Sequence, residues 1–294
     1  MYPRPFEYAR PESVAEALEA LAGDGASEAR PLAGGQSLVP MMSLGLAAPD
    51  LLVDLARLPL AGSEGNGGGT VRLGALTRHR ELERSAELAA RVPLASEAAR
   101  FIGNPRVRNR GTLGGSLSHA DPASELGTVA LAYGGRAVIT GQGGERSVDF
   151  DEFFHGFFET AVESGELLTA VELDVPGAGS GHGFHEVAGR ADDFAIAAAA
   201  AVVTLDEAGA ACADARLALA GIADRPLRIG AGEDVCRGAA IDEPLLDRVA
   251  AAVTEAVTPE DDAFVSAEYR ARAAGTCAAR ALAAAWERAR EGAR

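Results

Sequence analysis

The hydrophobic positions near the beginning of the chain follow the spacing of an amphipathic helix. Ser13 and Glu16 match a capping box, in which a hydroxyl and a carboxylate satisfy free amides at a helix start. The apolar residues that follow fall on one helical face: Val14, Ala17, Leu18 and Leu21. The pattern therefore predicts a helix that begins at Ser13 and packs its apolar face on a core.

Farther along, short apolar runs alternate with longer helical patterns. The apolar runs predict buried strands at 51–55, 71–73, 167–175, 194–205 and 213–219. Helical spacing predicts helices at about 77–90, 244–257 and 266–289. Composition shifts at Pro176–Gly181, a run of glycine and other small residues. We therefore expect an α+β fold, with one domain over residues 1–176 and a smaller one over 182–290.

Charge narrows the classes of function. The 294 residues carry a formal net charge of −16, and all 27 basic residues are arginine. Without lysine a Walker phosphate loop is excluded, and the acidity disfavours nucleic acid and anionic membranes as partners. The chain has no apolar run long enough for a membrane helix and no secretory pattern at its beginning, so we expect a cytoplasmic protein. The three cysteines form no CxxC pair, which predicts buried thiols.

Two glycine-rich segments are the candidates for binding chemistry. The first runs from Pro31 to Ser37 and the second from Arg110 to Ser116. Adjacent glycines allow successive backbone amides to converge on an anion, and the hydroxyls of Ser37, Thr112 and Ser116 offer further donors. Neither segment matches the GxGxxG pattern of a Rossmann site. From the residues alone, a dinucleotide site and a pair of ordinary turns both stay open.

Two further patterns carry alternatives. Arg106, Arg108 and Arg110 alternate, so an extended backbone would place them on one face, as a positive field near a diphosphate or as plain solvated charge. His182 and His185 lie close in sequence, but polar residues at the start of a strand explain them better than a metal site does. The chain shows no acid–base constellation, so we expect neither catalytic residues nor a bound metal of its own.

Motifs in a fixed order run through nearly the whole chain. The most specific is RNRGTLGGSLSHADP, from Arg108 to Pro122. The others are Pro5-Phe6-Glu7-Tyr8, Arg10-Pro11, the first glycine segment, Ala48 to Leu55, Gly165 to Thr169, Asp193-Phe194-Ala195 and Glu268-Tyr269-Arg270. In this order they resemble the FAD-binding medium subunit of carbon monoxide dehydrogenase and xanthine dehydrogenase family molybdenum hydroxylases.

This resemblance implies a fold, a cofactor and a set of contacts. The fold is a vanillyl-alcohol-oxidase-like, PCMH-type FAD-binding domain followed by a smaller carbon monoxide dehydrogenase flavoprotein C-terminal α/β domain. The residues that wrap the FAD diphosphate are Ala33, Gly34, Gly35, Gln36 and Ser37 in the first segment, with Thr112, Leu113, Gly114, Gly115 and Ser116 in the second. Glu125 contacts the polar part of the cofactor, Leu168 offers a backbone contact near the isoalloxazine ring, and Phe194 flanks the flavin. Ile102 is a further candidate for packing on FAD.

Two positions depart from what the resemblance implies. Relatives carry a lysine near the flavin where this chain has Glu186, and an arginine where it has Gly45. A carboxylate does not stabilise an anionic reduced flavin as an ammonium group does. These departures bear on the flavin potential and on the contacts that follow the first segment.

The resemblance also implies partners and a role. A large molybdopterin-binding subunit oxidises the substrate, a small [2Fe–2S] subunit carries the electrons, and this chain passes them through FAD to an external acceptor. The expected assembly is a dimer of heterotrimers. A stand-alone flavin oxidoreductase of the same fold and a scaffold subunit without FAD are the alternatives.

Overall fold

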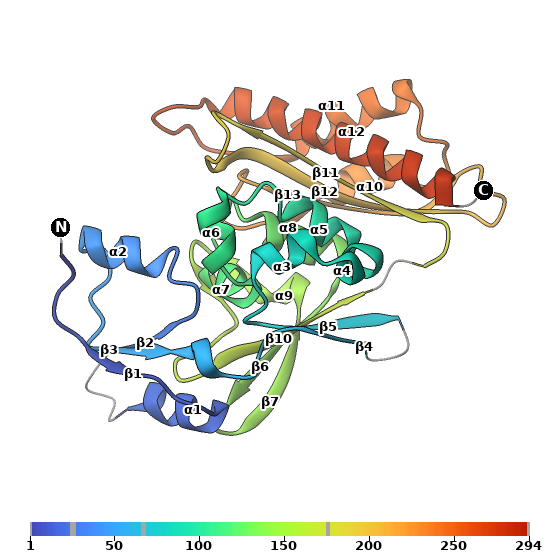
Figure 1. Ribbon diagram of the computed structural model, residues 1–294. Coiled ribbons are helices and arrows are strands. Elements are labelled where there is room, and N and C mark those ends of the chain that lie inside the picture. Colours follow the sequence, from blue (N-terminus) through green and yellow to red (C-terminus); the bar gives the residue numbers. More distant parts are fainter. Residues whose placement is uncertain (1, 24–27, 66–68, 175–176, 293–294) are drawn as a thin grey trace.

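The computed structural model describes the chain except for residues 1, 24–27, 66–68, 175–176 and 293–294. Helices and strands form successive layers (Figure 1). A small N-terminal sheet with one helix lies at one end, and a five-stranded sheet follows it. A layer of short helices separates this sheet from a four-stranded C-terminal sheet, and long helices cover the outer face of that sheet. The arrangement confirms the predicted mixture of helices and strands.

The N-terminal layer is a parallel three-stranded sheet with strand order β1-β3-β2. Its strands are β1 (Glu7–Ala9), β2 (Ala29–Leu32) and β3 (Leu51–Asp54). The predicted first helix is α1 (Val14–Ala22), and the Ser13 side chain accepts a hydrogen bond from the Glu16 amide as a cap. Its apolar face is buried as expected, through Ala17, Leu18 and Leu21. Helix α2 (Leu38–Leu44) follows β2 and stands apart from this sheet in Figure 1.

The second sheet has the order β4-β5-β10-β6-β7. Its strands are β4 (Ser63–Gly65), β5 (Thr70–Gly74), β6 (Gly135–Gly141), β7 (Gly144–Asp149) and β10 (Leu167–Asp174). Beside it lie α9 (Phe150–Phe153) and the short hairpin of β8 (Phe154–Gly156) with β9 (Glu159–Thr160). Strand β10 is central and nearly all buried, including Thr169 and Glu172, the two polar residues that interrupt its apolar positions.

Short helices cover this sheet on one side. They are α3 (His79–Arg84), α4 (Ala86–Arg91), α5 (Pro93–Ala98), α6 (Pro105–Arg110), α7 (Leu113–His119) and α8 (Glu125–Tyr133). The prediction of one helix over 77–90 is wrong, because Ser85 adopts an extended backbone between α3 and α4. Its side chain accepts from the Leu88 amide and so caps the second helix.

The C-terminal sheet is antiparallel, with the order β11-β12-β13-β14. It consists of β11 (Ser180–Ala188), β12 (Ala195–Leu205), β13 (Cys212–Ala220) and β14 (Leu227–Arg228). Helices α10 (Gly230–Cys236), α11 (Glu243–Ala256) and α12 (Ala267–Gly292) pack on its outer face. The predicted strands and the two closing helices are confirmed. The predicted boundary, Pro176–Gly181, begins at a residue that lies outside the described residues.

Small residues allow this sheet to be covered on both faces. Along β12, alternate alanines belong to two different hydrophobic clusters, one beneath α11 and α12 and one shared with the short helices. A Cβ atom at Gly183 of β11 would lie 3.0 Å from the carbonyl carbon of Ala281 in α12, and closer still to its oxygen.

The three cysteines are free and buried, as predicted. No described helix combines the length and apolar character that crossing a membrane requires.

Candidate functional site

The two glycine segments, far apart in sequence, meet in the structure. A Cβ atom at Gly34 would lie 2.8 Å from the Cα atom of Gly111 and closer still to the carbonyl oxygen of Arg110. A Cβ atom at Gly115 would lie 3.6 Å from that of Ala33. The backbones of the two segments therefore touch, and glycine at position 34 is what permits the approach.

The first segment leaves a run of backbone amides without partners. Among the described residues, no acceptor receives a hydrogen bond from the amides of Gly34 to Ser37. Gly35 adopts a φ of +72°, which side-chain-bearing residues rarely adopt, and this turns the chain between β2 and α2. The Gln36 side chain donates to the Gly34 carbonyl and braces the turn. Several unsatisfied amides in consecutive positions favour a bound anion.

The second segment differs from the first, because Thr112 caps α7. Its side chain accepts from the Gly115 amide, while the Leu113 and Gly114 amides donate to the carbonyls of Thr77 and Ala75. Gly114 is explained by packing, since a Cβ atom there would lie 2.5 Å from that of Ala75. These amides are already satisfied. Thr112 is buried, and the Ser116 Oγ lies 3.1 Å from the Ser124 Oγ, so the predicted cofactor contact of this segment depends on what these hydroxyls can still donate and on Gly115. Gly115 lies beside Ala33, at the seam where the two glycine segments touch.

His79 packs against the backbone of the second segment, a role that was not predicted from the sequence. Its Nε2 lies 2.9 Å from the Thr112 carbonyl oxygen, and its ring packs under Gly111. Burial lowers the pKa of His79 to about 4, so the ring is neutral at neutral pH and its Nε2–H donates to the carbonyl. The sequence signal is slight: a histidine at the start of a helix, directly after Arg78.

The prediction that three alternating arginines share one face is wrong, because Pro105–Arg110 is helical. Asn104 caps this helix by accepting from the amides of Arg106 and Val107. Arg108 is buried and holds Glu83 as well as the carbonyls of Ile102 and Gly103. It is a structural cation.

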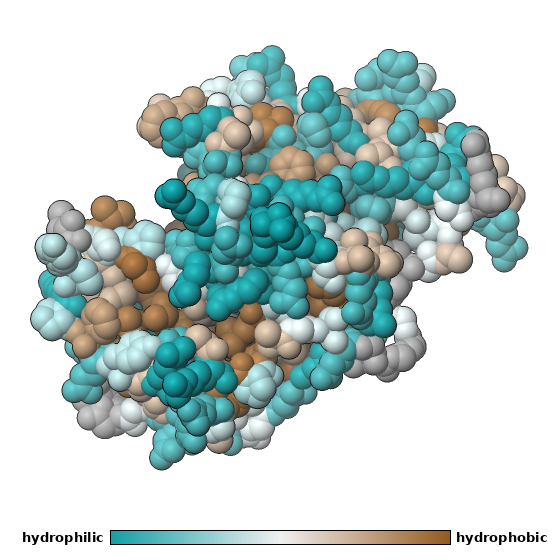
Figure 2. Space-filling view, viewed as in Figure 1, coloured by the Kyte–Doolittle hydropathy of each residue, from teal (hydrophilic) through white to brown (hydrophobic). Residues whose placement is uncertain are grey.

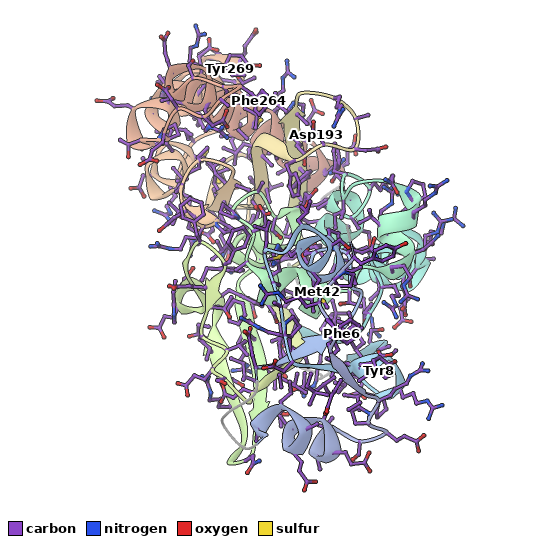
Figure 3. The ribbon with its side chains drawn as sticks, turned by 90° about the vertical axis from the view of Figure 1, so that its left-hand side faces the viewer. Phe6, Tyr8, Met42, Asp193, Phe264 and Tyr269 are labelled. Atoms are coloured by element: carbon purple, nitrogen blue, oxygen red, sulfur yellow. The ribbon has the colours of Figure 1, made fainter. Side chains whose placement is uncertain are left out.

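The remaining predicted cofactor residues come from several different elements. Glu125 begins α8, and Leu168 is buried in β10 at an irregularity of the strand pairing. Ile102 is a member of the hydrophobic core. Phe194 is 72% exposed, unusual for a large apolar side chain. Asp193, its neighbour, accepts from the Phe194 amide and is labelled above Met42 of α2 in Figure 3.

Two carboxylates near one another have raised pKa values. Burial raises the pKa of Glu125 to about 8, with smaller contributions from the charges of Glu186 and Asp121. Burial also raises the pKa of Glu186 to about 7, and its buried Oε2 has no hydrogen-bond partner among the described residues. Glu186, one of the two departures in sequence, is thus a poorly solvated acid. The other, Gly45, ends α2 in a left-handed conformation with a φ of +75°.

The two histidines considered as metal ligands have other partners. His182 lies 3.5 Å from Glu97, whose carboxylate also pairs with Arg288. The Nε2 atom of His185 lies 3.1 Å from the Arg280 guanidinium. Both contacts tie β11 to neighbouring helices and explain the histidines structurally.

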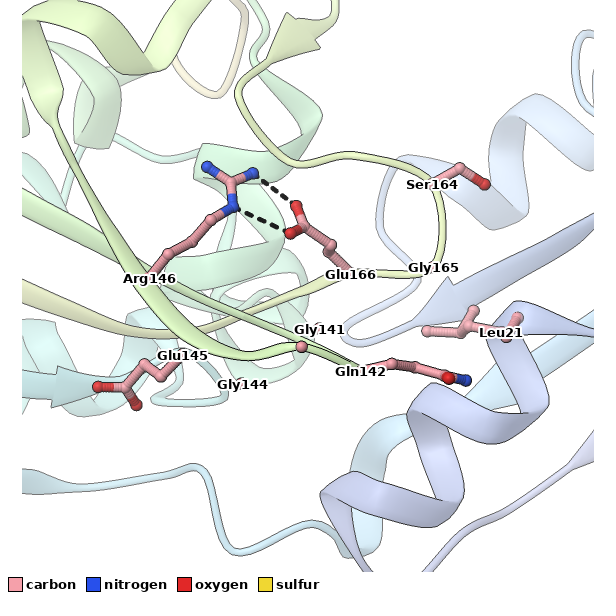
Figure 4. Close-up of a pocket in the computed structure, with 11 residues that line it drawn as sticks. Leu21, Gly141, Gln142, Gly144, Glu145, Arg146, Ser164, Gly165 and Glu166 are labelled. Atoms are coloured by element: carbon pink, nitrogen blue, oxygen red, sulfur yellow. Dashed lines mark hydrogen bonds and ion pairs between the residues drawn. The ribbon is translucent and has the colours of Figure 1, made fainter.

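A cavity of about 470 Å³ lies elsewhere, at the tip of the β6–β7 hairpin beside α1 (Figure 4). Arg146 lies in it but pairs through two hydrogen bonds with Glu166. The cation is therefore neutralised. None of the residues predicted to bind the cofactor lines this cavity, and we do not assign the cofactor to it.

In the space-filling view, hydrophobic and hydrophilic residues are interspersed over the face of the molecule that it shows (Figure 2).

Comparisons with known proteins show the family to which the chain belongs. The family model described as FAD binding domain in molybdopterin dehydrogenase matches residues 4–176, and the CO dehydrogenase flavoprotein C-terminal domain matches 182–285. The 6-hydroxypseudooxynicotine dehydrogenase complex subunit alpha of Paenarthrobacter nicotinovorans is 38% identical over 99% of this chain and 97% of its own length. The carbon monoxide dehydrogenase medium chain of Afipia carboxidovorans is also 38% identical, over 96% and 97%.

Solved structures give the same result. A chain of the reconstituted CO dehydrogenase from Oligotropha carboxidovorans superimposes with a TM-score of 0.92 at 37% identity, covering 98% of this chain and 100% of that one. The predicted fold and the predicted cofactor are confirmed by these matches. The chain belongs to the family of FAD-binding medium subunits of carbon monoxide dehydrogenase-type molybdenum hydroxylases, and it is an oxidoreductase subunit.

Proposed function

We propose that this chain binds FAD between its two glycine segments and relays electrons within a cytoplasmic complex. The electrons come from [2Fe–2S] clusters of a small partner subunit and leave to an external acceptor, after a large molybdopterin-binding subunit has oxidised the substrate. The complex is a dimer of heterotrimers. Bound FAD supplies the redox chemistry, and this chain supplies binding and electrostatics.

The run of free amides from Gly34 to Ser37 is the observation that carries the proposal. Four consecutive donors without acceptors are costly unless water or a ligand satisfies them. A diphosphate presents enough acceptor oxygens to satisfy all four. The contact between Gly34 and Arg110 holds this run beside the second segment, where the Thr112 and Ser116 hydroxyls and Gly115 are the predicted further contacts.

The flavin end of the cofactor has its own candidates. The large exposed ring of Phe194 is an apolar surface that a planar flavin would cover. Leu168 offers a backbone contact at the strand irregularity in β10, and Glu125 contacts the polar part of the cofactor. The raised pKa values of Glu125 and Glu186 reduce their negative charge near neutral pH, so each acid would oppose an anionic reduced flavin beside it only in its ionised form.

The proposed partners rest on what the relatives are called. One relative is a subunit of a dehydrogenase complex, and another is the medium chain of carbon monoxide dehydrogenase. Each matches this chain over nearly its whole length, so the division of labour between subunits transfers as a proposal. An isolated FAD-binding chain that carries out its own substrate oxidation is the rival account.

Removal of FAD from the purified complex tests the relay. The clusters are reduced with dithionite and the excess dithionite is removed before a tetrazolium dye is added. We expect the FAD-depleted complex to lose most of its transfer to the dye and to regain it when FAD is added back. The spectra of the iron–sulfur clusters serve as the control for intact partners. Unchanged transfer without FAD would contradict the relay, and substrate-dependent bleaching of the isolated chain's flavin would favour the stand-alone enzyme.

A further inference from the structure

Arg78 is a cation without an acidic partner at the seam between the glycine segments. Among the described residues, no carboxylate lies within ion-pair distance of Arg78 or of Arg110. Arg78 is half-buried, and its pKa is lowered first by burial and then by the nearby charge of Arg110, against a smaller opposing effect of Asp54. Two neighbouring guanidinium groups repel one another, so a bound anion between them would be stabilised.

The position of the Arg78 guanidinium is fixed by the second segment. Arg78 forms an isolated β-bridge with Thr112, which brings its backbone alongside the segment. Its Nη1 donates a hydrogen bond to the carbonyl oxygen of Arg110. The other guanidinium N–H groups have no acceptor among the described residues, and a planar guanidinium with free N–H groups matches the geometry of a phosphate.

The same carbonyl oxygen is the one that Gly34 abuts. Arg78 and Gly34, the first residue of the run of free amides, therefore both adjoin a single atom, the Arg110 oxygen. Free amides and an unpaired cation together present donors and charge to one small volume. Because the net charge of −16 disfavours anions near the protein, a local positive group would strengthen anion binding there.

We propose that the Arg78 guanidinium binds the diphosphate of FAD and supplies the charge that the glycine segments lack, with Arg110 as the second cation. This inference rests on the proposed binding of FAD. It assigns to Arg78 a contact beyond the amides and hydroxyls expected from the sequence. It predicts that Arg78 affects binding of the diphosphate and leaves binding of the flavin ring unaffected.

Arg78→Gln in the full chain tests the assignment, with Arg84→Gln as the control because Arg84 is an exposed arginine of α3, the helix that begins directly after Arg78. Dissociation constants for FAD and for riboflavin, which has no phosphate, are measured by quenching of flavin fluorescence. We expect Arg78→Gln to weaken FAD binding by about tenfold or more, the size of a lost charge-assisted hydrogen bond. Riboflavin binding stays within about twofold of wild type, and Arg84→Gln changes neither.

A potassium chloride titration gives a second reading, because salt screens a charge contact. The FAD affinity of the wild type should fall more steeply with salt than that of Arg78→Gln. Equal FAD affinity in Arg78→Gln and wild type would overturn the inference, as would an equal loss for FAD and riboflavin. If Arg78→Gln does not fold, Arg110→Gln replaces it with the same expected pattern. A wild-type chain that binds no FAD would instead contradict the proposed function.

Discussion

Gly34 packs its backbone against the carbonyl group of Arg110, at a distance that no side chain can share. This contact joins the turn after β2 to the residues that precede α7, two parts of the chain that lie far apart in the sequence of the first domain. The free amides of the candidate anion site begin at Gly34 itself. The binding geometry and the packing of the two segments therefore depend on the same residue.

Gly34→Ala is expected to weaken FAD binding by about tenfold or more and to lower stability by about 1–3 kcal/mol, the usual cost of overpacking. The added methyl group must push the Arg110 carbonyl away and open the seam. The measurements are FAD titration and the free energy of unfolding in urea. Gly143→Ala is the control, because a Cβ atom at Gly143 meets nothing within 4 Å. Wild-type FAD affinity in the Gly34→Ala variant would argue against the seam as the site.

The contact of β11 with α12 should be equally sensitive to the volume of the side chain at position 183. Gly183→Ala places a methyl group against the Ala281 carbonyl, and we expect a loss of about 1–3 kcal/mol in the free energy of unfolding. Gly189→Ala, at an open position just past the end of the same strand, should change stability by less than about 0.5 kcal/mol. Equal stability of the two variants would show that the helix can move away from the sheet at little cost.

The raised pKa values of Glu125 and Glu186 predict a pH dependence of stability in the FAD-free protein. The folded state keeps protons on these groups that the unfolded state releases above about pH 4.5. Their contribution to stability is therefore complete below pH 4.5 and is lost as the pH rises toward 7 and 8. Glu186→Gln removes one such group, so the variant should gain stability relative to wild type as the pH rises from about 5 to about 8.

The stability of wild type must be compared with that of Glu186→Gln, because His79 and His182 change the stability with pH in the opposite direction. Burial lowers the pKa of each to about 4, so their contribution is lost as the pH falls below 6.5. Thermal or urea unfolding of both proteins across this pH range isolates Glu186. Glu255→Gln, at an exposed position of α11, should show no such trend. A constant difference between wild type and Glu186→Gln at all pH values would contradict burial of this carboxylate.

Local patterns predicted helix α1, the two closing helices and five of the strands, because the side chains that define these elements act within a few residues. The capping box at Ser13 and the apolar run of β12 are examples. The break at Ser85 was missed, since a helical apolar spacing continues across it. The alternation of Arg106, Arg108 and Arg110 led to a wrong prediction of an extended backbone. Asn104 and Pro105, which precede it, are residues that favour the start of a helix.

The site was predicted only in part, for a physical reason. Adjacent glycines mark places where backbone approaches something closely, but the sequence does not say what. At Gly34 the approach is to Arg110, and at Gly114 it is to Ala75, so both are explained by contacts within the chain. Only the pattern of hydrogen bonds distinguishes the two segments. The amides of the first have no acceptor among the described residues, whereas those of the second donate to acceptors within the chain. The role of Arg78 could not be predicted from local sequence, because Arg110, whose carbonyl oxygen it binds, lies 32 residues away.

An experimental structure of the chain with FAD bound tests the account most directly. We predict that the diphosphate oxygens lie within hydrogen-bond distance of the amides of Gly34 to Ser37, with the Arg78 guanidinium on the same phosphates. A diphosphate bound away from this seam, for instance in the cavity beside the β6–β7 hairpin, with the four amides still free, would contradict it.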